Sequence, residues 1–196
     1  MTMDLHRDAA NINSTYHKLV KMKRKYNFGC GDKILPGYVN VDVSPSRRGK
    51  QPDIITDLQD IKGIPLGSAD EIMAIHVIEH FYYWEVIHIL SHWRTFLRPG
   101  GKIILECPNL LFACQTIVKN PATACLPDQQ GQMSMWPLYG DPSWRDPLMC
   151  HKWAYTPESL ALVLDQSGFC NIMKESAQFK LREPRDMRIT GINPEP

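Results

Sequence analysis

Short apolar stretches alternate with turn residues and helical stretches along the first half of the chain. Apolar runs bounded by turn residues predict strands over residues 25–28, 38–43, 53–55, 71–75 and 102–107. Apolar residues recur three and four positions apart over residues 84–96, which predicts an amphipathic helix that ends at Arg98-Pro99-Gly100-Gly101. Strands that alternate with helices predict an α/β domain with a mostly parallel twisted sheet and helices on both faces.

The second half of the chain predicts one more helix and two closing strands. Thr156 followed by Pro157 has the form of a helix N-cap, and Gly168 ends the apolar run behind it. Residues 171–179 and 187–193 predict strands, of which the C-terminal one is antiparallel. Residues 120–150 have no clear period and predict a lid-like insertion, while residues 1–24 predict an N-terminal helical segment.

The composition is that of a soluble globular protein with one domain over residues 1–196. Of its 196 residues, 43% are hydrophobic and 22% are charged, which excludes a disordered or fibrous chain. A net charge of +1 gives no general attraction to nucleic acid or membranes, and the basic run at residues 18–25 is interpreted as a solvated helix face. Six cysteines without a C-x-x-C pair, and no apolar leader, predict reduced thiols and a cytoplasmic location.

Two strand ends carry residues suited to a ligand. The first predicted strand runs into Gly29-Cys30-Gly31, where glycines let the backbone approach a ligand. The third glycine of a dinucleotide fingerprint would fall at Ile34, which disfavours NAD and FAD. Asp42 ends the second strand, where its carboxylate can accept hydrogen bonds from both hydroxyls of a ribose; the alternative is a turn or capping role.

At these residues the chain resembles the class I S-adenosylmethionine-dependent methyltransferases, in particular a small group whose first motif reads like NFGCG…PGYVNVD. The resemblance continues through Asp57-Leu58, HVIEH at 76–80, LRPGG at 97–101 and ECPN at 106–109. It covers residues 25–110 well and the rest weakly, through residues 155–169. It implies a single Rossmann-like domain and S-adenosylmethionine as the cofactor.

The resemblance also implies roles for individual residues around the cofactor. It places Gly29, Cys30 and Gly31 beside the methionine part, Asp42 at the ribose, Asp57 and Leu58 beside the adenine, and His76 at the closing end of the site. Residues 29–37 form a connection between the first two strands that is shorter than the usual parallel crossover. The first helix must therefore shrink to about one turn, or the predicted strand ends are wrong.

Methyl transfer from a sulfonium is an in-line displacement, so the enzyme must chiefly align the acceptor with the methyl carbon and exclude water. His80 or His151 could take a proton from a hydroxyl or amine acceptor, and structural roles are the alternative for both. We expect a small-molecule or glycan acceptor rather than nucleic acid, no membrane partner and no metal. The sequence fixes neither the acceptor nor the oligomeric state.

Two further functions stay open at this point, and a third is disfavoured. Small-RNA 3′-terminal 2′-O-methyltransferases, which bind a divalent metal beside the ribose hydroxyl, resemble the chain at VIEH and at His151-Lys152-Trp153. His76 stands where their first glutamate would be, and no RNA-binding domain is visible. The same core could also serve a non-catalytic S-adenosylmethionine-binding accessory protein. The H-x-x-E-H spacing at 76–80 matches a zinc protease motif, but that motif needs a helix and here follows a strand.

Overall fold

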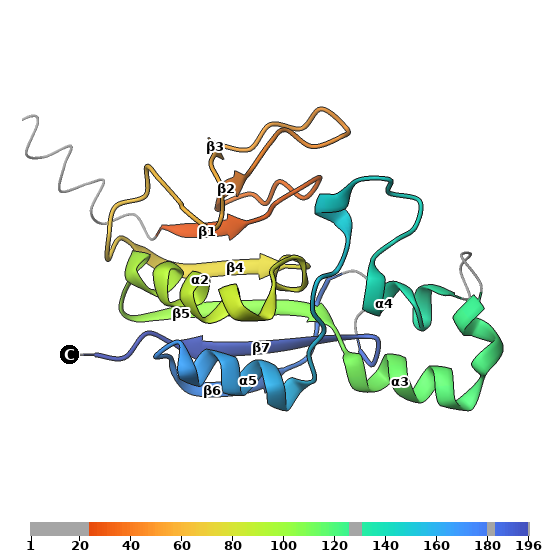
Figure 1. The fold of residues 1–196 in the computed structure, drawn as a ribbon. Helices are drawn as coiled ribbons and strands as arrows, with labels where there is room; N and C mark the ends of the chain where they lie inside the picture. The colour runs from red at the N-terminus through yellow and green to blue at the C-terminus, as the bar shows by residue number, and fades with distance from the viewer. Residues whose placement is uncertain (1–23, 126–130, 180–182, 196) are drawn as a thin grey trace, which may run out of the picture.

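The computed structural model describes residues 24–125, 131–179 and 183–195. Within these residues the chain forms a seven-stranded sheet in the order β3-β2-β1-β4-β5-β7-β6 (Figure 1). The strands are β1 (Lys25–Phe28), β2 (Val39–Asp42), β3 (Ile54–Ile55), β4 (Ala69–Ile75), β5 (Leu97–Pro108), β6 (Cys170–Glu175) and β7 (Asp186–Ile192). The pairs among β1 to β5 are parallel, whereas β7 is antiparallel to both β5 and β6. The predicted fold class, a mostly parallel sheet with an antiparallel C-terminal strand, is confirmed. Of the helices predicted on both faces, those that pack on the sheet within the described residues cover one face.

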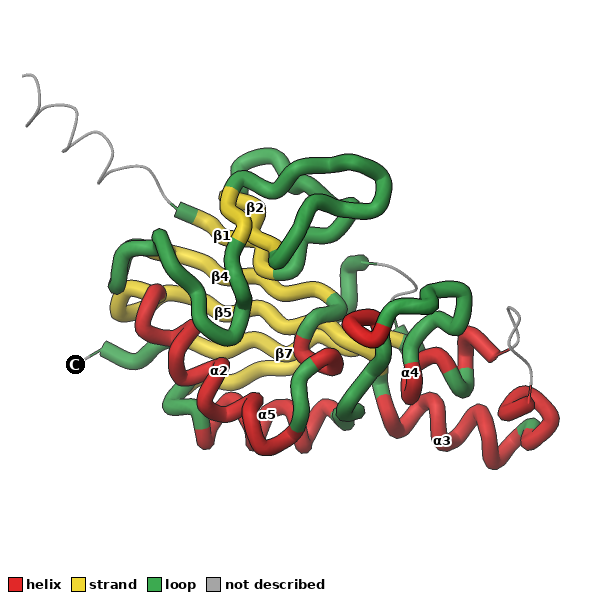
Figure 2. The backbone as a smooth tube through the Cα atoms, turned by 45° about the horizontal axis from the view of Figure 1, so that its top comes forward, coloured by secondary structure: helices red, strands yellow, loops and turns green. Residues whose placement is uncertain are grey.

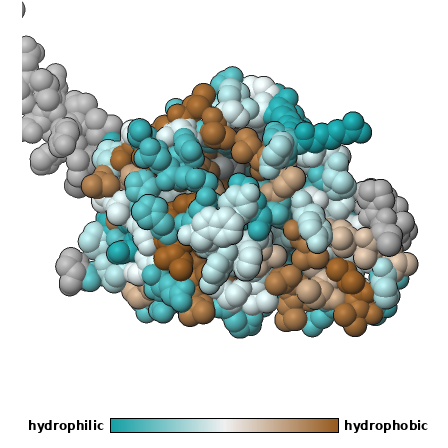
Figure 3. Space-filling model, viewed as in Figure 1, coloured by the Kyte–Doolittle hydropathy of each residue, from teal (hydrophilic) through white to brown (hydrophobic). Residues whose placement is uncertain are grey.

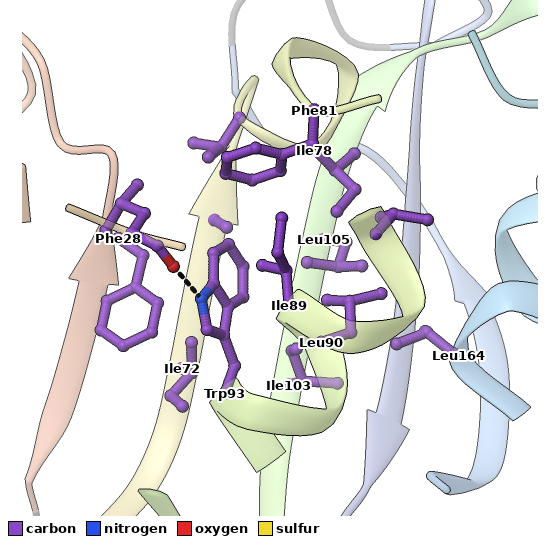
Figure 4. Close-up of a cluster of buried hydrophobic side chains, with 14 of the residues drawn as sticks. Phe28, Ile72, Ile78, Phe81, Ile89, Leu90, Trp93, Ile103, Leu105 and Leu164 are labelled. Carbon is purple, nitrogen blue, oxygen red and sulfur yellow. Dashed lines mark hydrogen bonds between the residues drawn. The ribbon is translucent and has the colours of Figure 1, made fainter. Parts of the chain in front are cut away.

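Two helices, α2 (Tyr83–Phe96) and α5 (Pro157–Gln166), lie side by side against one face of the sheet (Figure 2). Alternate residues of the central strands, such as Ile72 of β4 and Ile103 of β5, point to these helices and are fully buried. Trp93 of α2 is fully buried between its helix and these strands, and its Nε1 donates a hydrogen bond to the Leu58 carbonyl at 2.8 Å (Figure 4). Burial of this apolar face is the main source of stability for the sheet.

The strand residues that point to the other face of the sheet include charged side chains, which form ion pairs there. Lys102 lies 2.7 Å from Glu175, and Arg188 lies 2.9 Å from Glu106. A cavity of about 410 Å³ lies over this face. Lys25 and Glu71, near the amino ends of β1 and β4, are among the residues that line it. Because open α/β sheets bind ligands at the carboxyl ends of their strands, we do not place the predicted cofactor in this cavity.

Several elements differ from the sequence prediction. Residues 29–38 connect β1 to β2 through turns, without even the single helical turn that was expected. The helix α3 (Leu110–Lys119) was not predicted; its exposed Leu111 and Val118 contribute to the apolar surface around it (Figure 3). The predicted lid-like insertion contains short helical segments: η2 (Pro121–Cys125), η3 (Gly131–Met133), α4 (Trp136–Tyr139) and η4 (Pro147–Met149).

The predicted C-terminal helix is confirmed together with its N-cap. Thr156 Oγ1 accepts a hydrogen bond from the Ser159 backbone at 3.1 Å, and Ser159 Oγ accepts one from the Thr156 backbone at 2.9 Å. The predicted N-terminal helical segment, residues 1–24, lies outside the described residues except for Arg24. In the described part of the chain, no helix is both long and apolar enough to cross a membrane.

Candidate functional site

The carboxyl ends of β1 and β4 meet at the place where the strand order reverses. β1 pairs with β2 on one side and with β4 on the other, so the connections leaving these two ends diverge. A crevice at such a switch point is the usual ligand site of open α/β sheets. The predicted glycine loop, residues 29–31, follows β1, and the predicted HVIEH segment, residues 76–80, follows β4. The topology therefore brings these two motifs to the same edge of the sheet.

The glycine loop is folded tightly against the neighbouring strands. Gly29 and Cys30 both donate their backbone N–H to the Val41 carbonyl, at 2.8 and 3.2 Å. Gly29 has φ +65°, and a Cβ added there would lie 2.4 Å from Cγ2 of Val77, so the loop touches the segment that follows β4. Gly31 has φ +48°, yet a Cβ added there would meet no atom within 4 Å. Gly31 therefore borders open space.

Asp42 joins the end of β2 to this loop. Its Oδ2 accepts a hydrogen bond from the Gly31 backbone and its Oδ1 accepts one from the Val43 backbone, both at 2.7 Å. A carboxylate oxygen has two acceptor positions, so each oxygen can accept one more hydrogen bond. Asp42 thus has the turn or capping role that was the alternative to ribose binding, and it also keeps acceptor positions for a ligand.

Cys30 lies inside the loop and is 4% exposed. Burial, together with the negative charge of Asp42, raises the pKa of the Cys30 thiol to about 12. The thiol is therefore protonated at neutral pH and is suited to packing rather than to nucleophilic attack.

The two residues expected beside the adenine lie after β3 with different surroundings. Asp57 is exposed, and its Oδ1 accepts a hydrogen bond from the Gln59 backbone at 2.9 Å, which is a local turn. Leu58 is buried in the hydrophobic core next to Trp93. The side chain of Leu58 is therefore committed to the core.

His76 directly follows β4 and lies in the left-handed backbone region, with φ +57°. Its Nδ1 lies 3.0 Å from Glu79 Oε1 and its Nε2 lies 3.3 Å from Asp186 Oδ2. Both ring nitrogens are thus engaged by buried carboxyl groups, so His76 orients Glu79. Asp186 is not identifiable from the sequence, because no local pattern connects the start of β7 to the end of β4.

Glu79 is almost completely buried at this edge, with 1% of the residue exposed. Burial alone would raise its pKa, but the hydrogen bond with His76 and the charge of that imidazole outweigh it and hold the pKa of Glu79 well below its usual range. Glu79 is therefore ionised. Its Oε1 faces His76, whereas its Oε2 is buried without a hydrogen-bond partner.

His80 and His151, the two predicted proton acceptors, come together beside Glu79. Their ring centroids lie 5.0 Å apart at 84°. His80 Nδ1 lies 3.1 Å from the Cys150 carbonyl, and His151 Nδ1 lies 3.0 Å from the Pro137 carbonyl. Because a carbonyl only accepts, each Nδ1 carries the hydrogen, and the neutral ring has its lone pair on Nε2. Burial lowers the pKa of His151, although the Glu79 carboxylate opposes this shift.

The end of the lid-like insertion and the residues that follow it, 151–153, pack onto this cluster through the backbone. Lys152 and Trp153 both donate to the Glu79 carbonyl, at 2.8 and 3.2 Å, and thereby fix the position of His151. Tyr139, within the insertion, is 65% exposed, whereas the Trp153 ring packs on Tyr83 with centroids 4.9 Å apart. The segment directly after the insertion thus supplies His151 to the cluster, and the insertion itself leaves the Tyr139 ring at the surface.

No protein-family model matches the sequence, and no curated protein matches it, but solved structures do. A S-adenosylmethionine-dependent methyltransferase from Archaeoglobus fulgidus is similar over 93% of this chain and 91% of its own, with 17% identity and a TM-score of 0.56. A protein from Pyrococcus horikoshii OT3 is similar over 99% of this chain and 92% of its own, with 16% identity and a TM-score of 0.55.

Human N-acetylserotonin methyltransferase, solved in complex with S-adenosylmethionine, is similar over 92% of this chain and 50% of its own, with 14% identity and a TM-score of 0.54. The chain spans about half the length of this and some other similar methyltransferases. The chain therefore has the fold of the class I S-adenosylmethionine-dependent methyltransferases.

Proposed function

We propose that the protein is a S-adenosylmethionine-dependent methyltransferase that acts on a small-molecule or glycan acceptor. The observation that carries this proposal is the hydrogen bond at 2.7 Å between the Gly31 backbone and Asp42, at the switch point of a sheet with this strand order. It joins a glycine loop to a strand-end carboxylate, and that combination suits a ligand that has both an extended chain and a ribose.

The residues present fit this cofactor. Gly31 borders open space that a side chain would enter, which leaves room for the methionine part against the backbone. Asp42 keeps one acceptor position on each oxygen, enough for the two ribose hydroxyls. Asp57, at the exposed end of β3, is available for the adenine side. NAD fits less well, because Ile34 occupies the position of the third fingerprint glycine.

S-adenosylmethionine supplies an electrophilic methyl group when it is bound. Transfer breaks the bond between sulfur and the methyl carbon, forms a bond from that carbon to the acceptor, and leaves S-adenosylhomocysteine and one proton. The Nε2 lone pair of His80 or His151 is suited to accept that proton from a hydroxyl or amine. His76 closes this end of the site by holding Glu79 behind the two rings.

Calorimetry on the full chain tests the cofactor assignment. We expect binding of S-adenosylmethionine and S-adenosylhomocysteine but not of NAD. Asp42→Ala should weaken binding by about 1.5–3 kcal/mol, the range for hydrogen bonds to a charged group. Asp60→Ala is the matched control, since Asp60 is exposed and contacts only surface groups such as Lys62, at 3.0 Å.

Tight binding of NAD with no response to either sulfur compound would overturn the assignment. An unchanged affinity in Asp42→Ala would remove this residue from the site. Turnover separates an enzyme from an accessory protein: a bound cofactor that stays intact with every hydroxyl, amine and glycan acceptor in a panel would favour the accessory function.

A further inference from the structure

We propose that Glu79, His80 and His151 form a binding site for a divalent transition-metal ion, against the expectation from sequence that no metal is bound. One potential ligand atom from each residue lies within 4.8 Å of the other two. The cluster combines η1 (Ile78–His80), which follows β4, with His151, the first residue after the lid-like insertion. It therefore depends on the folded chain and not on one sequence motif.

The two histidines are oriented as metal ligands are. Each Nδ1 donates to a backbone carbonyl, that of Cys150 for His80 and that of Pro137 for His151. Such bonds fix the tautomer and the plane of the ring and leave the Nε2 lone pair for an ion. Nε2 of His151 lies 3.9 Å from Oε1 of Glu79, and the His80 ring lies beside that of His151, with centroids 5.0 Å apart.

Glu79 gives a second and independent indication. Its Oε2 is buried and has no hydrogen-bond partner, although a buried polar oxygen without a partner is costly. Its Oε1 lies 3.9 Å from His151 Nε2, which is too long for a hydrogen bond. Direct hydrogen bonding between Glu79 and His151 therefore leaves Oε2 of Glu79 without a partner, whereas a cation between the side chains would satisfy it.

The surroundings of Glu79 supply the support that ligating carboxylates usually have. His76 holds its Oε1 at 3.0 Å and is itself held by Asp186 at 3.3 Å. Hydrogen bonds of this kind orient a ligand and are a regular part of metal sites. His76 and Asp186 are therefore positioning residues for the proposed site.

The donor set decides which ions fit. Two imidazoles and one carboxylate suit Zn²⁺, Mn²⁺, Fe²⁺ or Co²⁺ better than Ca²⁺ or Mg²⁺, which prefer oxygen ligands. Bonds of about 2.0–2.1 Å to Zn²⁺ place tetrahedral ligand atoms roughly 3.3 Å apart, so the three side chains must close inward by about 1 Å. Three protein ligands leave at least one coordination position open, as in catalytic sites.

The site lies at the same edge as the glycine loop, because Val77, between His76 and the cluster, packs on Gly29. An ion at this place uses the Nε2 lone pairs that could otherwise accept a proton from the acceptor. Metal binding and the general-base role are therefore exclusive for each ring, and a metal titration distinguishes them.

The test is a titration of untagged full-length protein that has been treated with chelator and transferred to chelator-free buffer. Co²⁺ and Zn²⁺ are added and followed by calorimetry, and Co²⁺ also by its visible absorption bands. We expect one equivalent to bind. In His80→Ala and in His151→Ala the affinity should fall by at least about 10–100-fold, the loss that is typical even for residues that only support a ligand. His88→Ala, an exposed histidine of α2, should bind as the unmodified chain does.

Glu79→Gln removes the charge and keeps the shape, and a thermal melt checks that this variant is folded; if it is not, the two histidine variants decide the question. Absence of saturable binding in the unmodified chain overturns the proposal. Equal affinity in the unmodified chain, His80→Ala and His151→Ala also overturns it. The experiment contains no S-adenosylmethionine, so its outcome is independent of the proposed methyltransferase function.

Discussion

Gly29 and Gly31 lie two positions apart in one loop and both have a positive φ angle. They differ in the atoms that a side chain would meet at each position. Gly29 packs against Val77, and Gly31 faces open space. A left-handed conformation costs a non-glycine residue about 1–2 kcal/mol at either position. The two glycines therefore allow the packing requirement and the ligand requirement of the loop to be measured separately.

We expect Gly29→Ala to destabilise the fold more than Gly31→Ala, by a further ~1–3 kcal/mol, because the added methyl collides with a packed side chain. Gly31→Ala should keep most of the stability but weaken S-adenosylhomocysteine binding by about tenfold, or ~1.4 kcal/mol, because its methyl enters the cofactor space. Urea unfolding and calorimetry on both variants measure the two effects. Undiminished binding by Gly31→Ala would place the cofactor elsewhere.

The secondary-structure elements differ in how far the sequence predicts them. The central strands were predicted because β4 and β5 bury one apolar face against α2, but β5 begins at Leu97, five residues before the predicted start. α3 was not predicted, although its sequence has an amphipathic pattern, and in the fold only Ala113 of this helix is buried. The turn-only crossover after β1 was partly foreseen from its length, and the described segment satisfies its backbone through bonds such as Lys33 N to Cys30 O, at 2.8 Å.

The sequence also predicts the local parts of the site better than its long-range contacts. The glycine loop and Asp42 are local motifs at strand ends, so the sequence alone locates them. The environment of Glu79 depends on His151, which is far away in the sequence, and the support of His76 depends on Asp186. Only the folding of the lid-like insertion and β7 onto the end of β4 creates these contacts. Whether each predicted site residue binds the cofactor stays a prediction.

The lid-like insertion allows a test at the level of one element, because two of its aromatic rings differ in burial. Trp136 begins α4 and has its Nε1 buried, whereas Tyr139 ends α4 and is 65% exposed. We expect Trp136→Ala to lower stability by about 1–3 kcal/mol, less than for a fully buried tryptophan. For a chain of this size, each kcal/mol lowers the melting temperature by about 2–4 °C.

Tyr139→Ala should leave both the melting temperature and S-adenosylhomocysteine affinity unchanged. If the insertion forms part of the acceptor pocket, the same variant should lower turnover once an acceptor is found, since an exposed ring has no packing role to lose. Melting curves and turnover on both variants give the answer. A stable Tyr139→Ala variant with full activity would remove this ring from the pocket.

For the molecule as a whole, the reactivity of Cys30 reports how often the fold opens. Its pKa of about 12 leaves roughly 10⁻⁴ of the thiol ionised at pH 8, and burial blocks access, so alkylation proceeds mainly through opened forms of the chain. Because this pKa lies above the ordinary 9.0, the folded state also loses stability as the pH rises from 9.0 toward 12. Cys114 is exposed on α3 and serves as an internal control that reacts without opening.

S-adenosylhomocysteine at 100 times its dissociation constant should slow alkylation of Cys30 about 100-fold, because a ligand that binds only the folded state stabilises it by about 2.7 kcal/mol. The rate at Cys114 should not change. Treatment with iodoacetamide at pH 8, followed by mass spectrometry of the cysteine peptides over time, measures both rates in one sample. Asp42→Ala should lose most of this protection at the same ligand concentration, since binding is weakened. If Cys30 reacts as fast as Cys114 without ligand, the loop is open in solution; if the ligand slows both cysteines equally, the protection does not come from the glycine loop.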